Sequence, residues 1–410
     1  MMKMSFDRDA VLLLAEKYES FYLYDGRTIA ENIAVLQGNF EGVRFLYSVK
    51  ANPHPAVLRC IIDEGVGVDA ASLREVTMGK ENGLAAGDIY YSAPGKSPRD
   101  INAALGCSTI IADSPAEVER IQAIAEGHGI TADIGIRLNP DFSFDGEGGS
   151  ASKFGIDEEE AFRLLPQWKG YKNVRIRGIH VHSRSQELRG ELIAAYYGRM
   201  FELAVRFQNA LGHELRFVNM GSGIGIPYAE QDAPVDIKAL GASMSALIRQ
   251  YRPQLPRTEI LVESGRFIVG KAGVYATHVM DKKVSHGRTF VLLANTLGGF
   301  VRPSVAQMVE SYTREEKPAG CEPLYTGRNA FGFVPLTEDR DTETVTVTGS
   351  LCTGADVIAQ DILLPRLECG DVFVITNAGS YAASVSPMQF ASLEPPAQIF
   401  LPEFGEPSAL

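Results

Sequence analysis

Lys50 is the residue of this sequence whose type and position most directly suggest chemistry. It follows the apolar, β-prone segment Phe45-Leu-Tyr-Ser-Val49 and precedes the break Asn52-Pro-His-Pro55. A lysine at the end of a buried strand can present its amine to an aldehyde and form a Schiff base. The alternative is a strand-end lysine whose stem is covered while its ammonium group reaches water.

Further polar residues stand where other apolar segments end. Glycines at such a place, as in Gly221-Ser-Gly-Ile-Gly225, let backbone N–H groups approach a phosphate. A tight turn is the alternative for the glycines, a structural role is the alternative for His182, and His180 is expected to be a structural histidine. The polar residues at predicted strand ends are Lys50, Asp69, Arg137, Asn139, His182, Ser185, Glu263 and Arg266.

These residue types together match what pyridoxal 5'-phosphate needs from a protein. Lys50 would bind the aldehyde, the glycines and Ser185 the phosphate, and Glu263 the pyridine nitrogen. A carboxylate beside the ring nitrogen favours its protonated form, which strengthens the ring as an electron sink for the carbanion left by loss of CO₂. The pattern therefore predicts a decarboxylase.

Short apolar segments alternate with amphipathic ones between Arg44 and Val262, which predicts a (β/α)8 TIM barrel with its functional groups at the C-terminal ends of the strands. β-branched segments after Arg266 predict a second, mostly β domain, which the strand-like Phe21–Tyr24 could join. The expected domains are 27–265 for the barrel and 1–26 with 266–410 for the β domain. The predicted barrel strands are Arg44–Val49, Val66–Ala70, Ile89–Ser92, Thr109–Ala112, Asp133–Leu138, Arg177–His182, Phe217–Met220 and Glu259–Val262.

Composition excludes several classes of function. Lys and Arg number 39 against 51 Asp and Glu, and the net charge of −12 disfavours binding to nucleic acid or anionic lipid. The apolar segments are too short to span a membrane and the first 26 residues do not resemble a signal peptide, so we expect a cytoplasmic protein. An odd number of scattered cysteines predicts neither a disulfide framework nor a metal site; they are Cys60, Cys107, Cys321, Cys352 and Cys369.

Six motifs follow one another between about Tyr22 and Leu401. They are Tyr47-Ser-Val-Lys-Ala-Asn52, Gly178-Ile-His-Val-His-Ser-Arg-Ser-Gln186, Gly221-Ser-Gly-Ile-Gly-Ile-Pro-Tyr228, Glu263-Ser-Gly-Arg266, Cys352-Thr-Gly-Ala-Asp356 and Ala378-Gly-Ser-Tyr381. In this order they resemble the signatures of the fold-type III pyridoxal-phosphate decarboxylases, which include diaminopimelate and ornithine decarboxylases.

The resemblance implies a role for each matching residue. Lys50 would be the Schiff-base lysine, His182 would stack on the cofactor ring, and Glu263 would pair with the pyridine nitrogen. Asp69 and Arg137 would support the lysine and the ring. The other residues that the resemblance assigns to the cofactor, mainly to its phosphate, are Ser185, Gly221, Ser222, Gly223, Ser264, Gly265, Arg266 and Tyr381.

The resemblance also implies a homodimer whose subunits share their active sites. The partner subunit's Cys352 would protonate the carbanion after CO₂ leaves, and Lys153 would pair with Asp356 across the interface. The alternatives are a small buried hydrophobe for Cys352 and a solvated surface charge for Lys153.

Departures from the family pattern concern the substrate. Thr353 stands where the familiar relatives carry an acid, and a hydroxyl gives no ion pair to a distal ammonium group. Arg302 could bind a carboxylate or be a surface arginine, and Asp356 and Tyr381 complete the expected substrate contacts. Two further departures concern phosphate binding: Ser222 lies within the glycine run, and Arg184 stands where the family usually has glycine.

The Cys-Thr pair and both ends of the chain resemble the decarboxylases of staphyloferrin-type siderophore and butirosin assembly. We therefore expect a decarboxylase that removes the α-carboxylate of an amino acid held in a larger, small-molecule or carrier-linked conjugate. The alternative enzymes are diaminopimelate decarboxylase and lysine or ornithine decarboxylase, against which Thr353 argues, and a racemase, against which Glu263 argues. A non-enzymatic cofactor carrier or inactive regulatory homologue is the last alternative, and the presence of Cys352 and Tyr381 argues against it.

Overall fold

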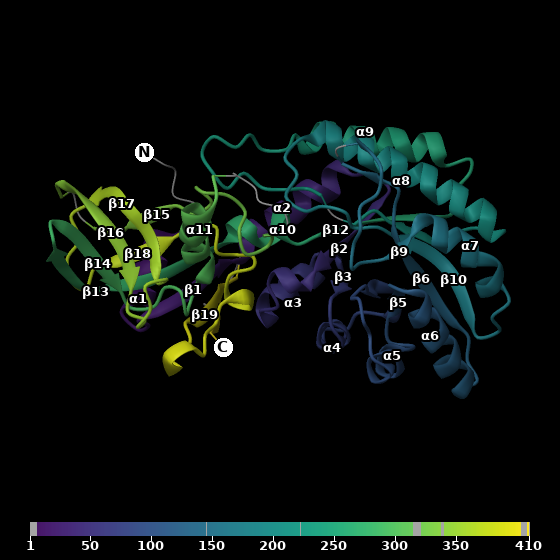
Figure 1. Cartoon of the computed structure of the whole chain (residues 1–410), viewed down its shortest axis with the longest axis horizontal. Helices are drawn as coiled ribbons and strands as arrows, with labels where there is room; N and C mark the ends of the chain where they lie inside the picture. The colour runs from purple at the N-terminus through teal and green to yellow at the C-terminus, as the bar shows by residue number, and fades with distance from the viewer. Residues whose placement is uncertain are drawn as a thin grey trace.

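Two β-sheets organise the computed structural model of this chain, which describes residues 6–144, 146–221, 223–314, 321–337, 340–402 and 408–409. Figure 1 shows the two sheets toward opposite ends of the long axis. Ser222, one of the residues predicted to bind the cofactor, lies outside the described residues.

The first sheet is a closed barrel of eight parallel strands. Strand β10 pairs with both β6 and β11, and β12 pairs with β2, which closes the ring. Strands inside such a barrel are covered on both faces, which explains why they read as continuous apolar segments. The predicted TIM barrel is confirmed. Its strands are β2 (Val43–Ser48), β3 (Gly67–Ala70), β4 (Ile89–Tyr91), β5 (Thr109–Ala112), β6 (Ala132–Asn139), β10 (Val174–His180), β11 (Phe217–Asn219) and β12 (Glu259–Ser264).

Helices surround the barrel, and several begin at recognisable signals. The hydroxyls of Ser72, Ser97 and Ser114 accept hydrogen bonds from the backbone three residues later, and proline follows Ser97 and Ser114 at the first helical turn. Among the described residues, no helix combines the length and hydrophobicity that crossing a bilayer requires. The helices around the barrel are α2 (Gly26–Asn39), α3 (Pro55–Asp63), α4 (Leu73–Glu81), α5 (Pro98–Ala104), α6 (Pro115–Gly127), α7 (Glu158–Lys169), α8 (Gly190–Leu211) and α9 (Ile237–Tyr251).

The second sheet is formed mainly by the last third of the chain. The N-terminal strand β1 belongs to it, since β1 pairs antiparallel with β13 and parallel with β19. The domain limits at 26/27 and 265/266 stay a prediction. The elements of this part are α1 (Arg8–Ala15), β1 (Ser20–Asp25), β13 (Gly273–Ser285), β14 (Arg288–Leu293), α11 (Val301–Tyr312), β15 (Phe333–Pro335), β16 (Thr342–Gly349), β17 (Val357–Pro365), β18 (Val372–Ile375), β19 (Ala397–Leu401) and β20 (Ser408–Ala409).

The two parts meet at the turn that carries Lys50. This residue lies in a short 3₁₀ helix, Val49–Ala51, directly after β2. The backbone N–H of Tyr381 donates to the carbonyl of Ala51 at 2.8 Å, and the Asn52 side chain donates to the carbonyl of Gly379 at 3.0 Å. The segment after β18 is therefore bonded to the lysine turn at the mouth of the barrel.

Candidate active site

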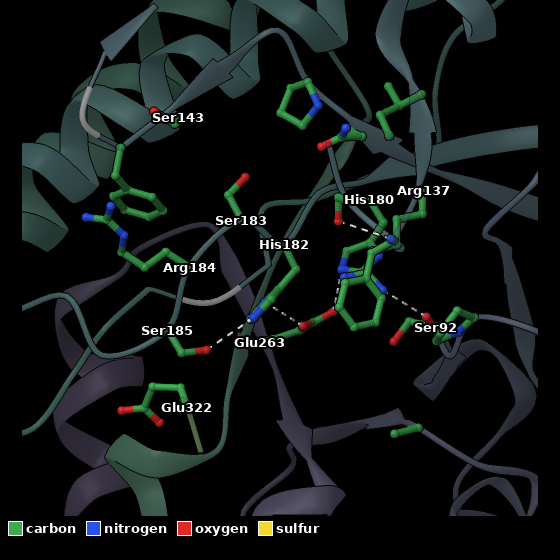
Figure 2. Close-up of a pocket in the computed structure, with 18 of the residues that line it drawn as sticks. Ser92, Arg137, Ser143, His180, His182, Ser183, Arg184, Ser185, Glu263 and Glu322 are labelled. Atoms are coloured by element: carbon green, nitrogen blue, oxygen red, sulfur yellow. Dashed lines mark hydrogen bonds and ion pairs between the residues drawn. The ribbon is translucent and has the colours of Figure 1, made fainter. Parts of the chain in front are cut away.

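A cavity of about 520 Å³ opens at the C-terminal ends of the barrel strands. Its size lies within the ordinary range of small-molecule sites. Figure 2 shows side chains from several strand ends and loops pointing into it. The predicted site residues that line it are Lys50, Arg137, Asn139, His182, Ser185, Glu263, Arg266 and Tyr381.

Lys50 is paired with a carboxylate on the neighbouring strand. Its Nζ donates to Asp69 Oδ2 at 3.0 Å, and the Lys50 side chain is 39% exposed, facing the cavity, while Asp69 is fully buried. Burial alone would lower the pKa of Lys50, but Asp69, Tyr381 and Glu263 raise it above its ordinary value. Ser48 and Ser92 also donate to Asp69, which fixes the carboxylate behind the lysine.

Glu263 is a buried carboxylate surrounded by nitrogen atoms. His180 Nε2 lies 3.0 Å from its Oε1, His182 Nδ1 lies 3.6 Å from its Oε2, and Asn219 Nδ2 donates to Oε1 at 2.9 Å. Burial alone would raise the pKa of Glu263, but the two histidines lower it well below its ordinary value. The site therefore contains a carboxylate that stays ionised although its side chain is only 1% exposed.

His182 projects from the segment after β10 between Glu263 and Ser185. Its Nε2 lies 3.2 Å from the Ser185 hydroxyl, and Figure 2 shows the ring between these two residues. Burial lowers the pKa of His182, which favours the neutral imidazole. A neutral ring is suited to lie against a flat aromatic ligand, because it brings no charge that would have to be desolvated.

Arg266 lies at another wall of the cavity. Its Nη1 donates to Thr326 at 2.9 Å and to Glu322 at 3.4 Å, and its guanidinium centre lies 5.2 Å from the centre of the Tyr381 ring. Its Nε is buried and has no hydrogen-bond partner among the described residues. Arg266 therefore combines a fixed position with unused donor capacity.

Arg137 occupies the side of the cavity formed by β6. Its Nη1 lies 3.4 Å from Asp113 Oδ1, and its guanidinium is 4.5 Å from the centre of the Phe154 ring. Only 8% of the side chain is exposed. The ion pair with Asp113 and the contact with Phe154 hold the Arg137 guanidinium at the wall of the cavity.

The described residues of the predicted glycine cradle do not line the cavity. Gly221, Gly223, Ser264 and Gly265 are absent from the described residues that line it. At Gly221, where φ is +65°, an added Cβ would lie 2.2 Å from the carbonyl oxygen of Val181. Close contact with the neighbouring strand end therefore accounts for this glycine without a phosphate.

Two predicted substrate residues are buried in the second part of the chain. Arg302 is fully buried, and its donors go to the carbonyl of Ser380 and the hydroxyl of Thr326, so it is neither a surface arginine nor a lining residue. Asp356 is 2% exposed and accepts from Thr296, Leu297 N and Leu351 N. An ion pair with the partner subunit's Lys153 would have to share these oxygens.

Cys352 and Thr353 lie in the turn between β16 and β17, away from the described lining of the cavity. Cys352 is exposed, so the alternative of a small buried hydrophobe is wrong. Lys153 is exposed beside the cavity, and its Nζ lies 4.8 Å from the centre of the Phe154 ring.

The cavity fits pyridoxal 5'-phosphate. An amine with a fixed carboxylate partner, an ionised buried carboxylate and a neutral histidine face one space large enough for the cofactor. The unpartnered Nε of Arg266 and the Ser185 hydroxyl are suitable donors for its phosphate group.

Comparison with known proteins agrees with this chemistry. A family model for the pyridoxal-binding domain of pyridoxal-dependent decarboxylases matches residues 27–270. The chain belongs to this family. Its members depend on pyridoxal phosphate, so the predicted cofactor and the predicted decarboxylase activity are confirmed.

Similar proteins cover nearly the whole chain. The L-glutamyl-(BtrI acyl-carrier protein) decarboxylase of Niallia circulans is 29% identical, over 97% of this chain and 92% of that one. The diaminopimelate decarboxylase of Methanothermobacter thermautotrophicus is 30% identical, over 96% and 89%. The solved structure of Helicobacter pylori diaminopimelate decarboxylase complexed with L-lysine has a TM-score of 0.82 at 25% identity, covering 97% of this chain and 95% of that one.

Some residues of the site were not predicted from the sequence. His180 and Asn219 bind Glu263, and Ser92 binds Asp69. All three stand at or just after strand ends, which is a signal that could have identified them. Glu322 lies in an irregular segment after α11, where no sequence signal indicates that its carboxylate reaches the barrel.

Proposed function

We propose that the roles implied by the family resemblance apply to the residues of this cavity. Pyridoxal phosphate, when bound, supplies the electron-accepting pyridine ring that decarboxylation requires. Lys50 supplies the amine that anchors the cofactor, and Asp69 keeps that amine in place. Glu263 holds a proton at the ring nitrogen, and the neutral ring of His182 covers one face.

The remaining residues bind the phosphate group of the cofactor or supply the proton that replaces CO₂. Ser185 and Arg266 donate to the phosphate, and Tyr381 covers Arg266 from the second part of the chain. The turn with Cys352 lies outside the cavity of its own chain, which supports a homodimer in which the partner subunit's Cys352 delivers a proton to the carbon that has lost CO₂.

We further propose that the substrate is an amino acid carried in a larger conjugate. The single observation that carries this proposal is Thr353, an uncharged residue beside Cys352. It offers no carboxylate to a distal ammonium group, so an amino acid whose distal end is an amide, ester or thioester fits better. A relative named for a carrier-linked glutamyl substrate supports this choice.

Siderophore assembly or another specialised pathway in the cytoplasm would use such an enzyme. Mass spectrometry of CO₂ loss across free, citryl-linked and carrier-linked amino acids tests the substrate class. Conjugates should be decarboxylated far better than free lysine, ornithine or diaminopimelate. Thr353→Glu should move the preference toward a free diamine, because it restores a charge-assisted contact worth about 1.5–3 kcal/mol.

Mixing of inactive variants tests the shared active site. Lys50→Ala and Cys352→Ala proteins, dissociated and reassociated together, should recover roughly a quarter of wild-type activity, because half of the dimers are mixed and each holds one intact site of two. Subunits that exchange freely without regaining activity would exclude the shared site.

Diaminopimelate decarboxylase is the second candidate. It is favoured by the 30% identity, over 96% of this chain, with the enzyme of Methanothermobacter thermautotrophicus. Turnover of free diaminopimelate at the rate of the best conjugate would establish this candidate instead.

A further inference from the structure

Glu322 places a carboxylate of the chain itself on Arg266. Its Oε1 lies 3.4 Å from Arg266 Nη1, and its Oε2 binds Arg266 Nη2. A guanidinium that meets both oxygens of one carboxylate has the two-bond geometry with which arginine also binds phosphates and free carboxylates. The Arg266 side chain is 6% exposed, whereas that of Glu322 is 34% exposed and lines the cavity. This edge of the Arg266 guanidinium is therefore already occupied by an anion.

A second buried guanidinium belongs to the same site. The hydroxyl of Thr326 accepts from Arg266 Nη1 at 2.9 Å and from Arg302 Nη2 at 2.6 Å. Both guanidinium groups lie 5.5 Å from the centre of the Tyr228 ring. Within the described part of the chain, Glu322 is the one carboxylate in ion-pair contact with either arginine. Because a buried cation is costly unless an anion lies nearby, a site that lost this carboxylate should bind another anion more strongly.

An external anion at this wall would need the same nitrogen atoms. Glu322 lines the cavity together with Lys50, Ser185 and Arg266, and Figure 2 shows it on the same side of the view as Ser185. The Nε of Arg266 has no hydrogen-bond partner among the described residues, but an anion held there by two hydrogen bonds would share Nη2 with Glu322. Two like charges this close repel each other. Glu322 and an external anion therefore compete for Arg266.

We propose that Glu322 is a specificity-determining residue that occupies Arg266 as an internal anion and disfavours an external phosphate or carboxylate at this wall of the cavity. The inference rests on the proposed function, in which the phosphate of the cofactor and the distal end of the substrate are the groups that could reach Arg266. A substrate whose distal end is an amide, ester or thioester escapes the competition. Thr353 gives no ion pair to the distal ammonium group of free diaminopimelate, and Glu322 would oppose its distal carboxylate.

Two pairs of ligands that differ by one anionic group test the inference. Pyridoxal phosphate and pyridoxal, titrated into the apoprotein, differ by the phosphate. Diaminopimelate and lysine, bound to the cofactor-loaded protein and followed by stopped-flow absorbance, differ by the distal carboxylate. Glu322→Gln should tighten binding of at least one ligand that carries the extra anion by about 10-fold, the size of one charge-assisted hydrogen bond. The other member of that pair should stay within about twofold of its wild-type affinity.

The pair that responds identifies the anion. A gain for pyridoxal phosphate alone would assign the competition to the phosphate, and a gain for diaminopimelate alone would assign it to the carboxylate. Glu322→Ala should show the same gain, which would exclude new hydrogen bonds from the glutamine amide as the cause. No gain in either pair would overturn the inference, as would a loss of affinity for all four ligands, which would give Glu322 a merely structural role.

Glu310→Gln is the matched control. It removes one carboxylate from α11, makes the same change in charge and lies outside the described lining of the cavity. Its affinities for the four ligands should stay within about twofold of wild type, because it does not touch the anion site. A gain equal to that of Glu322→Gln would show that net charge, not the contact with Arg266, is responsible, and would overturn the inference.

Failure of the proposed function would give a different result. If wild type decarboxylated free diaminopimelate as fast as any conjugate, the proposed substrate would be rejected, but a gain for pyridoxal phosphate in Glu322→Gln would still uphold the competition at Arg266. If wild type preferred conjugates and neither ligand pair showed a gain in Glu322→Gln, only the role of Glu322 would be rejected.

Discussion

The two ends of strand β12 carry glutamates in opposite surroundings. Glu259 begins the strand, its side chain is 57% exposed, and it lies 3.5 Å from Arg44. Glu263 lies near the other end, is 1% exposed and is held by His180 and Asn219. An exposed ion pair contributes about 0–1 kcal/mol, whereas burying a charge costs several kcal/mol that fixed partners must offset. Within β12, the buried and ionised carboxylate stands at the end that faces the cavity with Lys50.

Cavity size does not distinguish these two ends. A second cavity of about 490 Å³ lies where the strands begin, nearly as large as the one that contains Lys50. Its charges are half-exposed and paired with one another, as in the contacts of Asp133 with Arg177 at 3.1 Å and Arg216 at 3.0 Å. Burial of the charged groups, rather than the volume of the cavity, distinguishes the end that contains Lys50.

The largest effect should follow from removing the amine. Lys50→Ala should abolish covalent attachment of the cofactor and lower kcat by about 1000-fold or more, because no other lysine is found among the described residues that line the cavity. Borohydride reduction of the wild-type protein and peptide mapping should find the pyridoxyl group on Lys50. A pyridoxyl group on another lysine would contradict the assignment.

The two glutamates of β12 give the sharpest comparison. Glu263→Gln should bind the cofactor but lower kcat by about 100-fold, since a neutral amide cannot hold the ring nitrogen protonated. Glu259→Gln is the matched control at the exposed end and should change kcat by less than about twofold. Single-turnover kinetics measures the chemical step for both, and similar rates in the two variants would remove the distinction between the ends.

A smaller effect concerns stability near Lys50. Burial raises the pKa of Glu75 to about 7, from an ordinary value of 4.5. Because the folded protein binds this proton more tightly, the contribution of Glu75 to stability is present below pH 4.5 and is lost as the pH rises through 7. Glu75→Gln should therefore exceed wild type in unfolding free energy by roughly 1–2 kcal/mol at pH 8.

Denaturant titrations from pH 4.5 to pH 8 test the direction of this pH dependence of the unfolding free energy. The difference between Glu75→Gln and wild type should shrink toward the acid end of the range, where the folded chain keeps this glutamate protonated and the unfolded chain protonates it in part. A difference that stays constant across the range would show that packing, not ionisation, is responsible.

The smallest effect is expected at the beginning of the strands. Arg216→Ala should lower the unfolding free energy by less than about 1 kcal/mol, because its side chain is 67% exposed. Raising the salt concentration should reduce even this difference. A loss of several kcal/mol would mean that the two ends of the barrel do not differ as described.

The barrel could be predicted from the sequence because its strands are buried on both faces. Strands covered on both faces read as apolar segments, and polar residues at their ends identify the functional mouth, as Lys50 and Glu263 illustrate. The glycine run shows the limit of such reasoning. Gly221 follows a strand as expected, yet its need for a small side chain comes from the carbonyl of Val181, just after β10, a contact that local sequence does not reveal.

Contacts between residues far apart in the chain could not be predicted from the local sequence either. Arg302 was a candidate for binding a carboxylate, but its burial against Ser380 and Thr326 depends on how the segment after α11 folds back. The same segment brings Glu322 to Arg266. Neither contact follows from periodicity or turn signals, because both join residues far apart in the chain.

The bonds between the lysine turn and residues 379–381 determine when the site is completed during synthesis. Lys50 leaves the ribosome early, but the carbonyl of Ala51 and the side-chain amide of Asn52 find their partners only after residues 379–381 have emerged. Domains fold as their sequence becomes available. The barrel strands are complete by Ser264, more than a hundred residues earlier, so a nascent barrel holds the reactive amine in an unfinished pocket. Capture of the cofactor in its final environment is therefore one of the last events in making this protein.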